Sequence, residues 1–357
     1  MINLYKNKCM IGGGGRNSFV DLLKGTCIVF VVFTHYSWTD NQRLKMLFPF
    51  WIDMAVPVFM IISGYVNALS FERKGVNSFK DCYSLKELIS KFFRLTIPFV
   101  FVVFLETIAD YVVFGDFSIT KILIMFFIGG KGPGSYYYPV MVQFVFLFPC
   151  IYVGIKQYRT KGLLVCFFIN AVYELLQKMY GMDEDLYRLL VIRYFFIISF
   201  GAYLAFLEKK RIRAKWGIAS FIIGFAFILI TKYTQYEPHI IRYWTGTSFL
   251  ACLYILPISY VLLRLIKKTK CALLELFGRA SFNIFLTQKV WFNYAAGFVY
   301  KHIDNIFIRL LINFVVCFIF GIVFYQIENP FSKKLISFLQ HGQNRMNKDF
   351  DALFLTA

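Results

Sequence analysis

Ten long apolar stretches, separated by short polar connections, constrain this chain more than any other feature of its sequence. They cover residues 19–38, 48–69, 95–114, 138–155, 162–177, 188–207, 216–231, 247–266, 282–298 and 306–325. A helix of about 20 apolar residues crosses the roughly 30 Å hydrocarbon core of a bilayer. Hydrophobic residues make up 59% of the chain, whereas soluble domains contain about 45–50%. We therefore expect an all-α integral membrane protein, a polytopic bundle of about ten transmembrane helices.

Basic residues alternate between the two sides of the expected membrane. Clusters of Lys and Arg precede the first stretch and follow every second one, within residues 6–16, 73–91, 156–161, 209–215, 267–279 and 333–334. Cytoplasmic connections carry the excess of Lys and Arg in membrane proteins, so we expect these connections and both termini in the cytoplasm. The formal charge of +19 therefore indicates topology and not nucleic acid, since a nucleic-acid binder gathers its basic residues on one hydrophilic face.

No connection is long enough to form a separate soluble domain. We expect one membrane domain over residues 1–340 and a short cytoplasmic tail over residues 341–357. The apolar run 119–128 is shorter than a crossing, which favours a re-entrant or interfacial piece. A Gly- and Pro-rich loop follows it at 129–134, on the outer face. None of the eight Cys forms a Cys-x-x-Cys pair, and we expect neither a disulfide framework nor a metal site.

Three ionisable residues, Asp21, Lys24 and His35, interrupt the first apolar stretch. Ionisable groups at membrane depth are expensive and are functional candidates by default. Asp21 and Lys24 lie three residues apart, so they can equally be a mutually neutralised pair at the cytoplasmic interface. His35 lies eleven residues beyond Lys24, about 16 Å further along a helix and within about 20° of the same face. An imidazole can take a proton from an attacking hydroxyl near neutral pH, although a lone buried His can also be a packing residue.

Two further segments carry weaker signals. Ser63 and Gly64, at the end of the second stretch, allow another backbone to approach closely and leave a hydroxyl in an apolar setting. Lys91 and Arg94 place two cations on one helix face at the cytoplasmic entrance. Such a pair suits phosphate groups, although anchoring of a helix at the cytoplasmic side is the more common reason for it.

Five segments occur in a fixed order along most of the chain. They are Lys24 with ten residues before His35, Phe59 to Tyr65, Lys91-x-x-Arg94, Phe277 to Leu286, and Ile327 to Phe331. In this order they resemble the membrane-bound acyltransferase family 3, over residues 17 to 331. Each segment alone is an unspecific motif, but the occurrence of all five in this order is hard to obtain by chance.

The resemblance implies about ten spans in a bacterial inner membrane, an acyl-coenzyme A donor on the cytoplasmic side, and an acceptor hydroxyl on the far side. The acyl group is most often acetyl, and the acceptor is a cell-surface or lipid-linked glycan. No cofactor is implied beyond the acyl-coenzyme A co-substrate. By the same carry-over, His35 is the catalytic His, Lys24 its paired basic residue, and Lys91 and Arg94 the donor-side cations. We also predict Asp21 as part of the catalytic set, and Ser63, Gly64 and Tyr65 as acyl-coenzyme A-binding residues.

Two departures from the family pattern affect these expectations. Members often have a His after the late Ser-aromatic helix, where this chain has Gln288. Any role of that His is absent here or passes to Gln288 as a hydrogen-bonding group. The family's Arg is replaced by Lys at positions 24 and 91, and Lys keeps the charge but loses the two-pronged geometry of Arg.

Other functions compete with this one. A transporter or flippase of a lipid-linked sugar would also use buried charges, although no internal repeat of the kind common in transporters is evident. A glycan polymerase or glycosyltransferase would need a larger outer loop. Further polar residues in the apolar stretches are better explained by structural pairing than by catalysis: Asp53, Glu106, Asp110, Glu174 and Arg193.

Overall fold

The computed structural model describes residues 18–115, 117–207, 213–234, 236, 238, 241, 244–265 and 269–355. All regular structure within these residues is helical. The first helices are α1 (Ser18–Thr34), α2 (Asp40–Lys45), α3 (Ala55–Arg73), α4 (Phe79–Cys82), α5 (Leu85–Phe114), α6 (Ile119–Ile128), α7 (Tyr137–Tyr158) and α8 (Thr160–Met179). The later ones are α9 (Glu184–Leu189), α10 (Phe195–Phe206), α11 (Ala214–Tyr233), α12 (Phe249–Leu265), α13 (Ala272–Arg279), α14 (Ser281–Val290), α15 (Ala296–His302) and α16 (Ile306–Leu355).

Seven helices of the described part are long and apolar enough to cross a membrane. They are Phe48–Arg73, Phe79–Phe114, Tyr137–Tyr158, Thr160–Met179, Ala214–Tyr233, Thr245–Leu263 and Ile306–Gln340. The three other expected spans correspond to shorter helical pieces: α1, the helix Val191–Phe206, and α14 with the π-helical turn Trp291–Ala295 and α15. The all-helical membrane fold is thus confirmed, and the count of about ten crossings stays a prediction. The run 119–128 forms the short separate helix α6.

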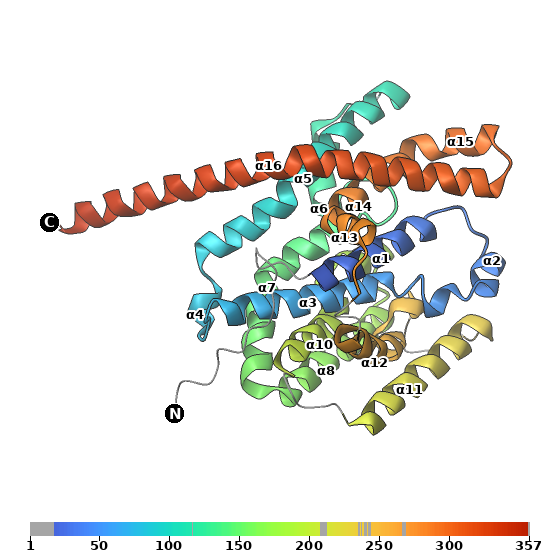
Figure 1. Ribbon diagram of the computed structural model, residues 1–357, viewed down its shortest axis with the longest axis horizontal. Helices are drawn as coiled ribbons and strands as arrows, with labels where there is room; N and C mark the ends of the chain where they lie inside the picture. Colours follow the sequence, from blue (N-terminus) through green and yellow to red (C-terminus); the bar gives the residue numbers. More distant parts are fainter. Residues whose placement is uncertain are drawn as a thin grey trace.

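The bundle has two distinct ends (Figure 1). Helix α4 and the last turns of α16 lie at one end, and α2 and the connection from α15 to α16 lie at the other. We call these the α4 end and the α2 end. Basic residues expected in the cytoplasm at positions 6, 8, 16, 209, 210, 211, 267 and 268 lie outside the described residues. The cytoplasmic position of the termini therefore stays a prediction.

Local sequence explains how the short helices at each end begin. Thr39 starts α2 with a capping box, in which its hydroxyl accepts from the Gln42 amide at 3.3 Å and Gln42 Oε1 accepts from the Thr39 amide at 3.0 Å. Ser78 and Asp81 form the same arrangement at α4. Such boxes satisfy amide groups that the first turn of a helix leaves without partners.

Pairs of glycines bring the inner helices into backbone contact. Gly25 of α1 packs on the backbone of α13, and Gly278 of α13 packs in turn on that of α1. Gly64 of α3 and Gly201 of α10 form the same reciprocal contact. Membrane helices associate largely through such close packing, because lipid is as apolar as their side chains.

This packing predicts which glycine tolerates a methyl group. A Cβ at Gly201 would strike the backbone of Ile61, so we expect Gly201→Ala to destabilise the protein by about 1–3 kcal/mol. Gly154 lies inside α7 with open space where its Cβ would be, so Gly154→Ala should be neutral or stabilise by up to about 1 kcal/mol. Thermal unfolding of both variants in detergent tests the difference, and equal melting temperatures would contradict it.

Candidate active site

His35 lies in the turn directly after α1, at the α2 end of the bundle. The expectation that the first helix continues past His35 is wrong, because side chains from beyond the turn take the last carbonyl groups of α1. Trp38 Nε1 donates to the Phe33 carbonyl at 2.7 Å, and Arg43 donates to the Thr34 carbonyl at 3.4 Å. The imidazole is half-buried, and its ring centroid lies 6.1 Å from that of Phe292. Within the described part, its ring nitrogens make no hydrogen bond.

One face of α1 leads from Lys24 toward His35. Lys24, Ile28 and Val31 recur at the four- and three-residue steps that align side chains along a helix, and His35 follows one step later. Lys24 is half-buried and Asp21 is 6% exposed, and both already interact with other groups.

A narrow cavity lies along this face between Lys24 and His35. Ile28 and Val31 line it with residues of α3, α7 and α14, namely Val56, Phe59, Tyr137, Ser281, Phe282 and Phe285. The space open to the centre of a water molecule is about 30 Å³. Four aromatic residues and two hydroxyl-bearing residues therefore line a cavity that is too small for a bulky group.

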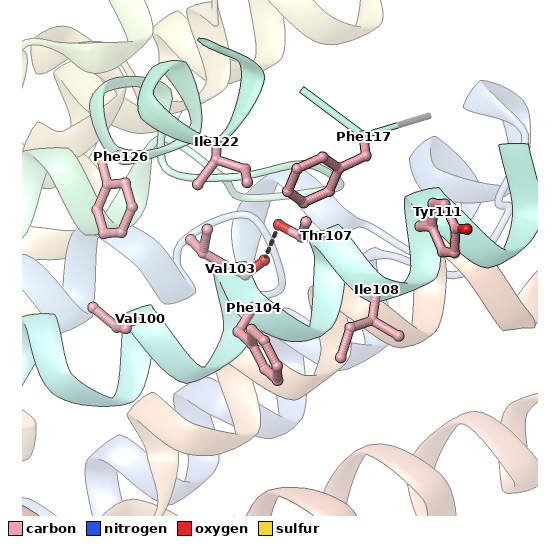
Figure 2. Close-up of a pocket in the computed structure, with 9 residues that line it drawn as sticks. All are labelled: Val100, Val103, Phe104, Thr107, Ile108, Tyr111, Phe117, Ile122 and Phe126. Atoms are coloured by element: carbon pink, nitrogen blue, oxygen red, sulfur yellow. Dashed lines mark hydrogen bonds between the residues drawn. The ribbon is translucent and has the colours of Figure 1, made fainter. Parts of the chain in front are cut away.

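A larger hollow elsewhere has no comparable chemistry. It lies between α5 and α6 and is lined by Val100, Val103, Phe104, Thr107, Ile108, Tyr111, Phe117, Ile122 and Phe126 (Figure 2). Its Thr107 hydroxyl donates to the Val103 carbonyl at 2.8 Å. Most of these side chains are exposed and apolar, as expected of a surface that faces hydrocarbon.

The loop 129–134, hereafter the glycine loop, closes the site beside His35. Gly129, Gly130, Gly132 and Gly134 all have φ between 80° and 84°, a region that other residues rarely adopt. A Cβ at Gly134 would lie 2.8 Å from the ring of Phe285 and 3.9 Å from His35 Nε2. The backbone of the glycine loop therefore lies against Phe285 and close to the imidazole of His35.

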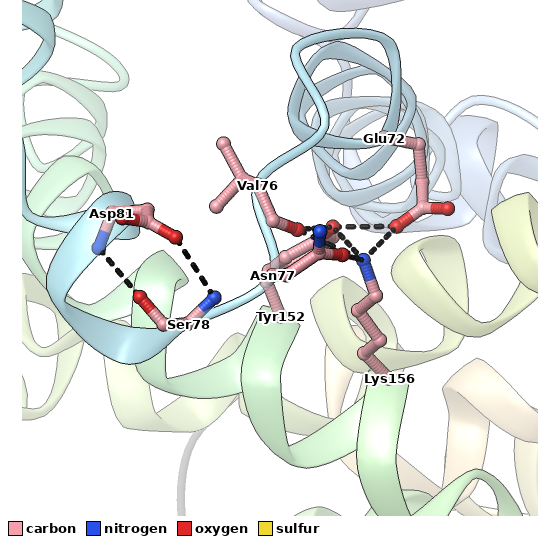
Figure 3. A network of polar contacts seen from close by, with 7 residues as sticks. All are labelled: Glu72, Val76, Asn77, Ser78, Asp81, Tyr152 and Lys156. Carbon is pink, nitrogen blue, oxygen red and sulfur yellow. Dashed lines mark hydrogen bonds and ion pairs between the residues drawn. The ribbon is translucent and has the colours of Figure 1, made fainter.

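The predicted donor-side cations lie toward the α4 end. Lys91 Nζ lies 4.3 Å from the ring centroid of Phe71, while Arg94 three residues later is exposed. A polar network beside them joins the end of α3 to α7 (Figure 3). In it Lys156 Nζ lies 2.7 Å from Glu72 and the Tyr152 hydroxyl donates to the same carboxylate at 2.5 Å.

The segment Ser63 to Tyr65 lies at a helix crossing. Gly64 packs on the backbone of Ile198 in α10, which confirms that the glycine permits close approach. The Ser63 carbonyl accepts from Asn67 Nδ2 at 3.0 Å, and Tyr65 is half-buried and has partners of its own. The contacts of Gly64 thus serve packing, and a role of the segment in donor binding stays a prediction.

The two late segments of the resemblance meet in space. Asn283 Nδ2 donates to Glu328 Oε2 at 3.1 Å, which joins α14 to α16 in a buried setting. Gln288 is completely buried on α14, and within the described part neither polar atom of its side chain has a hydrogen-bond partner. Gln288 lies one turn after Phe285 and one turn before Phe292, both of which flank the His35 region. An unpaired buried amide is costly.

Several other charged side chains form ion pairs or hydrogen bonds, and sequence reasoning missed their partners. Lys289 of α14 lies 3.6 Å from Glu106 of α5, and Lys131 of the glycine loop lies 2.6 Å from Asp110. The sequence does contain one sign that Lys289 needs a distant partner. It lies inside the apolar stretch 282–298, which contains no acidic residue. Elsewhere Asp53 pairs with Arg43, Glu174 accepts from the Phe249 amide, and Arg193 donates to Thr247 and stacks on Trp244.

A family model described as an acyltransferase domain, that of acyltransferase family 3, matches residues 17–326. The chain belongs to acyltransferase family 3. Searches of curated proteins and of solved structures found no match. The matched range of this membrane acyltransferase contains Lys24, His35, Lys91 and Gln288, so the site described above lies within the acyltransferase domain.

The turn that carries His35 should depend on Arg43. Arg43 bonds Thr34 and lies 2.7 Å from Asp53, so we expect Arg43→Met to destabilise the acyltransferase by about 1–3 kcal/mol through loss of charged hydrogen bonds. Removing both charges in Arg43→Met/Asp53→Asn should restore part of the loss, because no carboxylate is then left uncompensated. Thermal unfolding in detergent measures these differences.

The matched control is Lys74, whose pair with Glu87 is solvent-exposed. Lys74→Met should change stability by less than about 1 kcal/mol. A loss as large as that of Arg43→Met would show that removal of any cation destabilises the protein.

Proposed function

We propose that this acyltransferase moves a short acyl group, acetyl above all, from cytoplasmic acyl-coenzyme A to a hydroxyl of a cell-surface or lipid-linked glycan outside a bacterial inner membrane. The observation that carries the proposal is the narrow cavity along α1 between Lys24 and His35. Transfer across a bilayer needs a cation near the donor phosphates, a passage for the thioester, and a base near the acceptor. Along this face of α1, Lys24, the cavity and His35 follow one another in that order, which supports the proposal.

The donor enters from the α4 end in this proposal. The phosphates of coenzyme A bind Lys91 and Arg94, whose positions on one helix favour an anion over a neutral ligand. Lys24, with Asp21 beside it, attracts the charged part of the donor further in. The thin arm that bears the thioester then follows the line of this cavity, whose lining side chains move apart to admit it, with Ser63, Gly64 and Tyr65 on the neighbouring helix α3. The acceptor hydroxyl approaches His35 from the α2 end.

His35 acts as the general base. Its free ring nitrogen takes the proton from the acceptor hydroxyl as the oxygen attacks the thioester carbonyl. The carbon–sulfur bond then breaks, the thiolate leaves, and the imidazolium returns the proton to the sulfur. In an alternative order, the imidazole first attacks the thioester and carries the acyl group before passing it to the acceptor. Both orders yield an ester and free coenzyme A.

The central test removes the imidazole. We expect His35→Ala to lower acyl transfer by about 10²–10⁴-fold, the usual contribution of a general base. Membranes supplied with labelled acetyl-coenzyme A and assayed for label in glycan measure the change. The control is His302→Ala, because His302 is exposed on α15 at the same end. Undiminished transfer by His35→Ala would contradict the mechanism. A wild-type protein that moves glycan across the membrane without acetyl-coenzyme A would favour a flippase.

The tight aromatic lining of the cavity should select short acyl groups. Phe59 is 7% exposed and lines the passage, so we expect Phe59→Leu to raise the ratio of butyryl to acetyl transfer by about 3- to 10-fold, as in other apolar pockets. Phe144→Leu is the matched control, since Phe144 is also buried, at 2% exposed in α7, but does not line the cavity. Competition between the two donors in one assay measures the ratio. An equal ratio in both variants would contradict selection by this passage.

A further inference from the structure

The ion pair between Glu106 and Lys289 is buried, and the function proposed above gives it no role. The exposed fractions of the two side chains are 0% and 1%, and their charged atoms lie 3.6 Å apart. Burial of a charge costs several kcal/mol, and a buried pair is often no more stable than apolar residues in its place. Stability alone is therefore a weak reason for this pair to link α5 and α14.

The remaining bonds of the pair go to the glycine loop. Lys289 Nζ donates to the Gly129 carbonyl, and Glu106 Oε2 accepts from the Lys131 amide at 3.1 Å. Lys131 Nζ then reaches Asp110 at 2.6 Å, and the same carboxylate accepts from the Tyr294 hydroxyl at 2.7 Å. The first half of the glycine loop is thus fixed by groups from two helices that are far apart in the sequence.

The backbone of the glycine loop lies in close contact with Glu106 and Lys289. A Cβ at Gly130 would strike the Glu106 carboxylate and lie 2.8 Å from Lys289 Nζ, and one at Gly132 would lie 2.9 Å from the Lys289 carbonyl. Two residues later, Gly134 reaches the neighbourhood of His35 Nε2. The backbone therefore runs from the ion pair to the imidazole within one short loop.

We propose that Glu106 and Lys289 are positioning residues that hold the glycine loop against His35 and so shape the acceptor side of the active site. The proposal rests on the acyl transfer proposed above. Neither residue contacts the reacting atoms. Lys289 acts through the Gly129 carbonyl and Glu106 through the Lys131 amide. Release of the loop enlarges the space in front of the imidazole, and the acceptor hydroxyl then loses its alignment.

The test separates loop position from stability by using the full-length protein in lipid nanodiscs. Lys289→Met leaves Glu106 uncompensated, whereas Glu106→Gln/Lys289→Met removes both charges and should recover most of the melting temperature. We expect the double variant still to lose roughly tenfold or more in kcat, since small misplacements in an active site reduce rates strongly. Its KM for acetyl-coenzyme A should stay unchanged, because the donor binds toward the other end. Lys289→Arg keeps both charge and donor and should restore kcat in part.

The matched control is Glu174→Gln, which alters another carboxylate that is 0% exposed and bonds the Phe249 amide instead of the loop. It should lower the melting temperature without a comparable loss in kcat. A double variant that keeps the wild-type kcat would overturn the proposal. So would a Glu174→Gln variant that has the same melting temperature as the double variant and loses as much kcat.

Hydrogen exchange of the loop amides gives a readout that needs no turnover. We expect faster exchange over residues 129–135 in the double variant and unchanged exchange there in Glu174→Gln. Unchanged protection in the double variant would refute the positioning role even if the acyltransferase reaction is as proposed. A different result would separate the two proposals. If the double variant loses protection but the wild-type protein transfers no acetyl group, the proposed reaction is refuted, while the contact between the ion pair and the glycine loop is supported.

Discussion

A charge inside hydrocarbon has no water to solvate it, so it must find its partner within the protein. This constraint explains much of the described architecture. Glu106 on α5 is joined in this way to Lys289 on α14. At the α2 end, Arg43 of the short polar helix α2 also pairs with Asp53 ahead of α3, although both side chains stay partly exposed there. Each such pair connects segments that the hydrophobic effect alone would not orient, since lipid and apolar side chains are equally acceptable neighbours. The ion pairs thus fix which helices meet around His35.

Backbone contact between glycines supplies the second constraint. The α1–α13 and α3–α10 crossings are reciprocal, with a glycine of each helix lying on the backbone of the other. Such contacts hold α1 and α3 at fixed depth, and these are the helices that line the cavity below His35. A rigid frame of this kind permits a cavity with only about 30 Å³ of space open to the centre of a water molecule.

The helical membrane fold followed from hydropathy, because an apolar run of sufficient length is a local property of the sequence. The close packing of Gly64 was also predictable from the small residues around it. The end of α1 at Thr34 was not, since Arg43 beyond the turn takes part in ending it. Likewise, Lys289 carried no local sign of its pairing with Glu106, which arises only when α5 and α14 pack together.

The imidazole of His35 has no hydrogen-bond partner within the described chain, unlike many histidines whose second nitrogen is held by a carbonyl or carboxylate. No hydrogen bond from the described residues therefore selects one of the two neutral tautomers. In the reaction proposed above, the bound acceptor and thioester would select which nitrogen carries the proton. Under that proposal, the fold leaves the choice of tautomer open until substrate arrives, so the orientation of the reacting group is set at each turnover and not in advance.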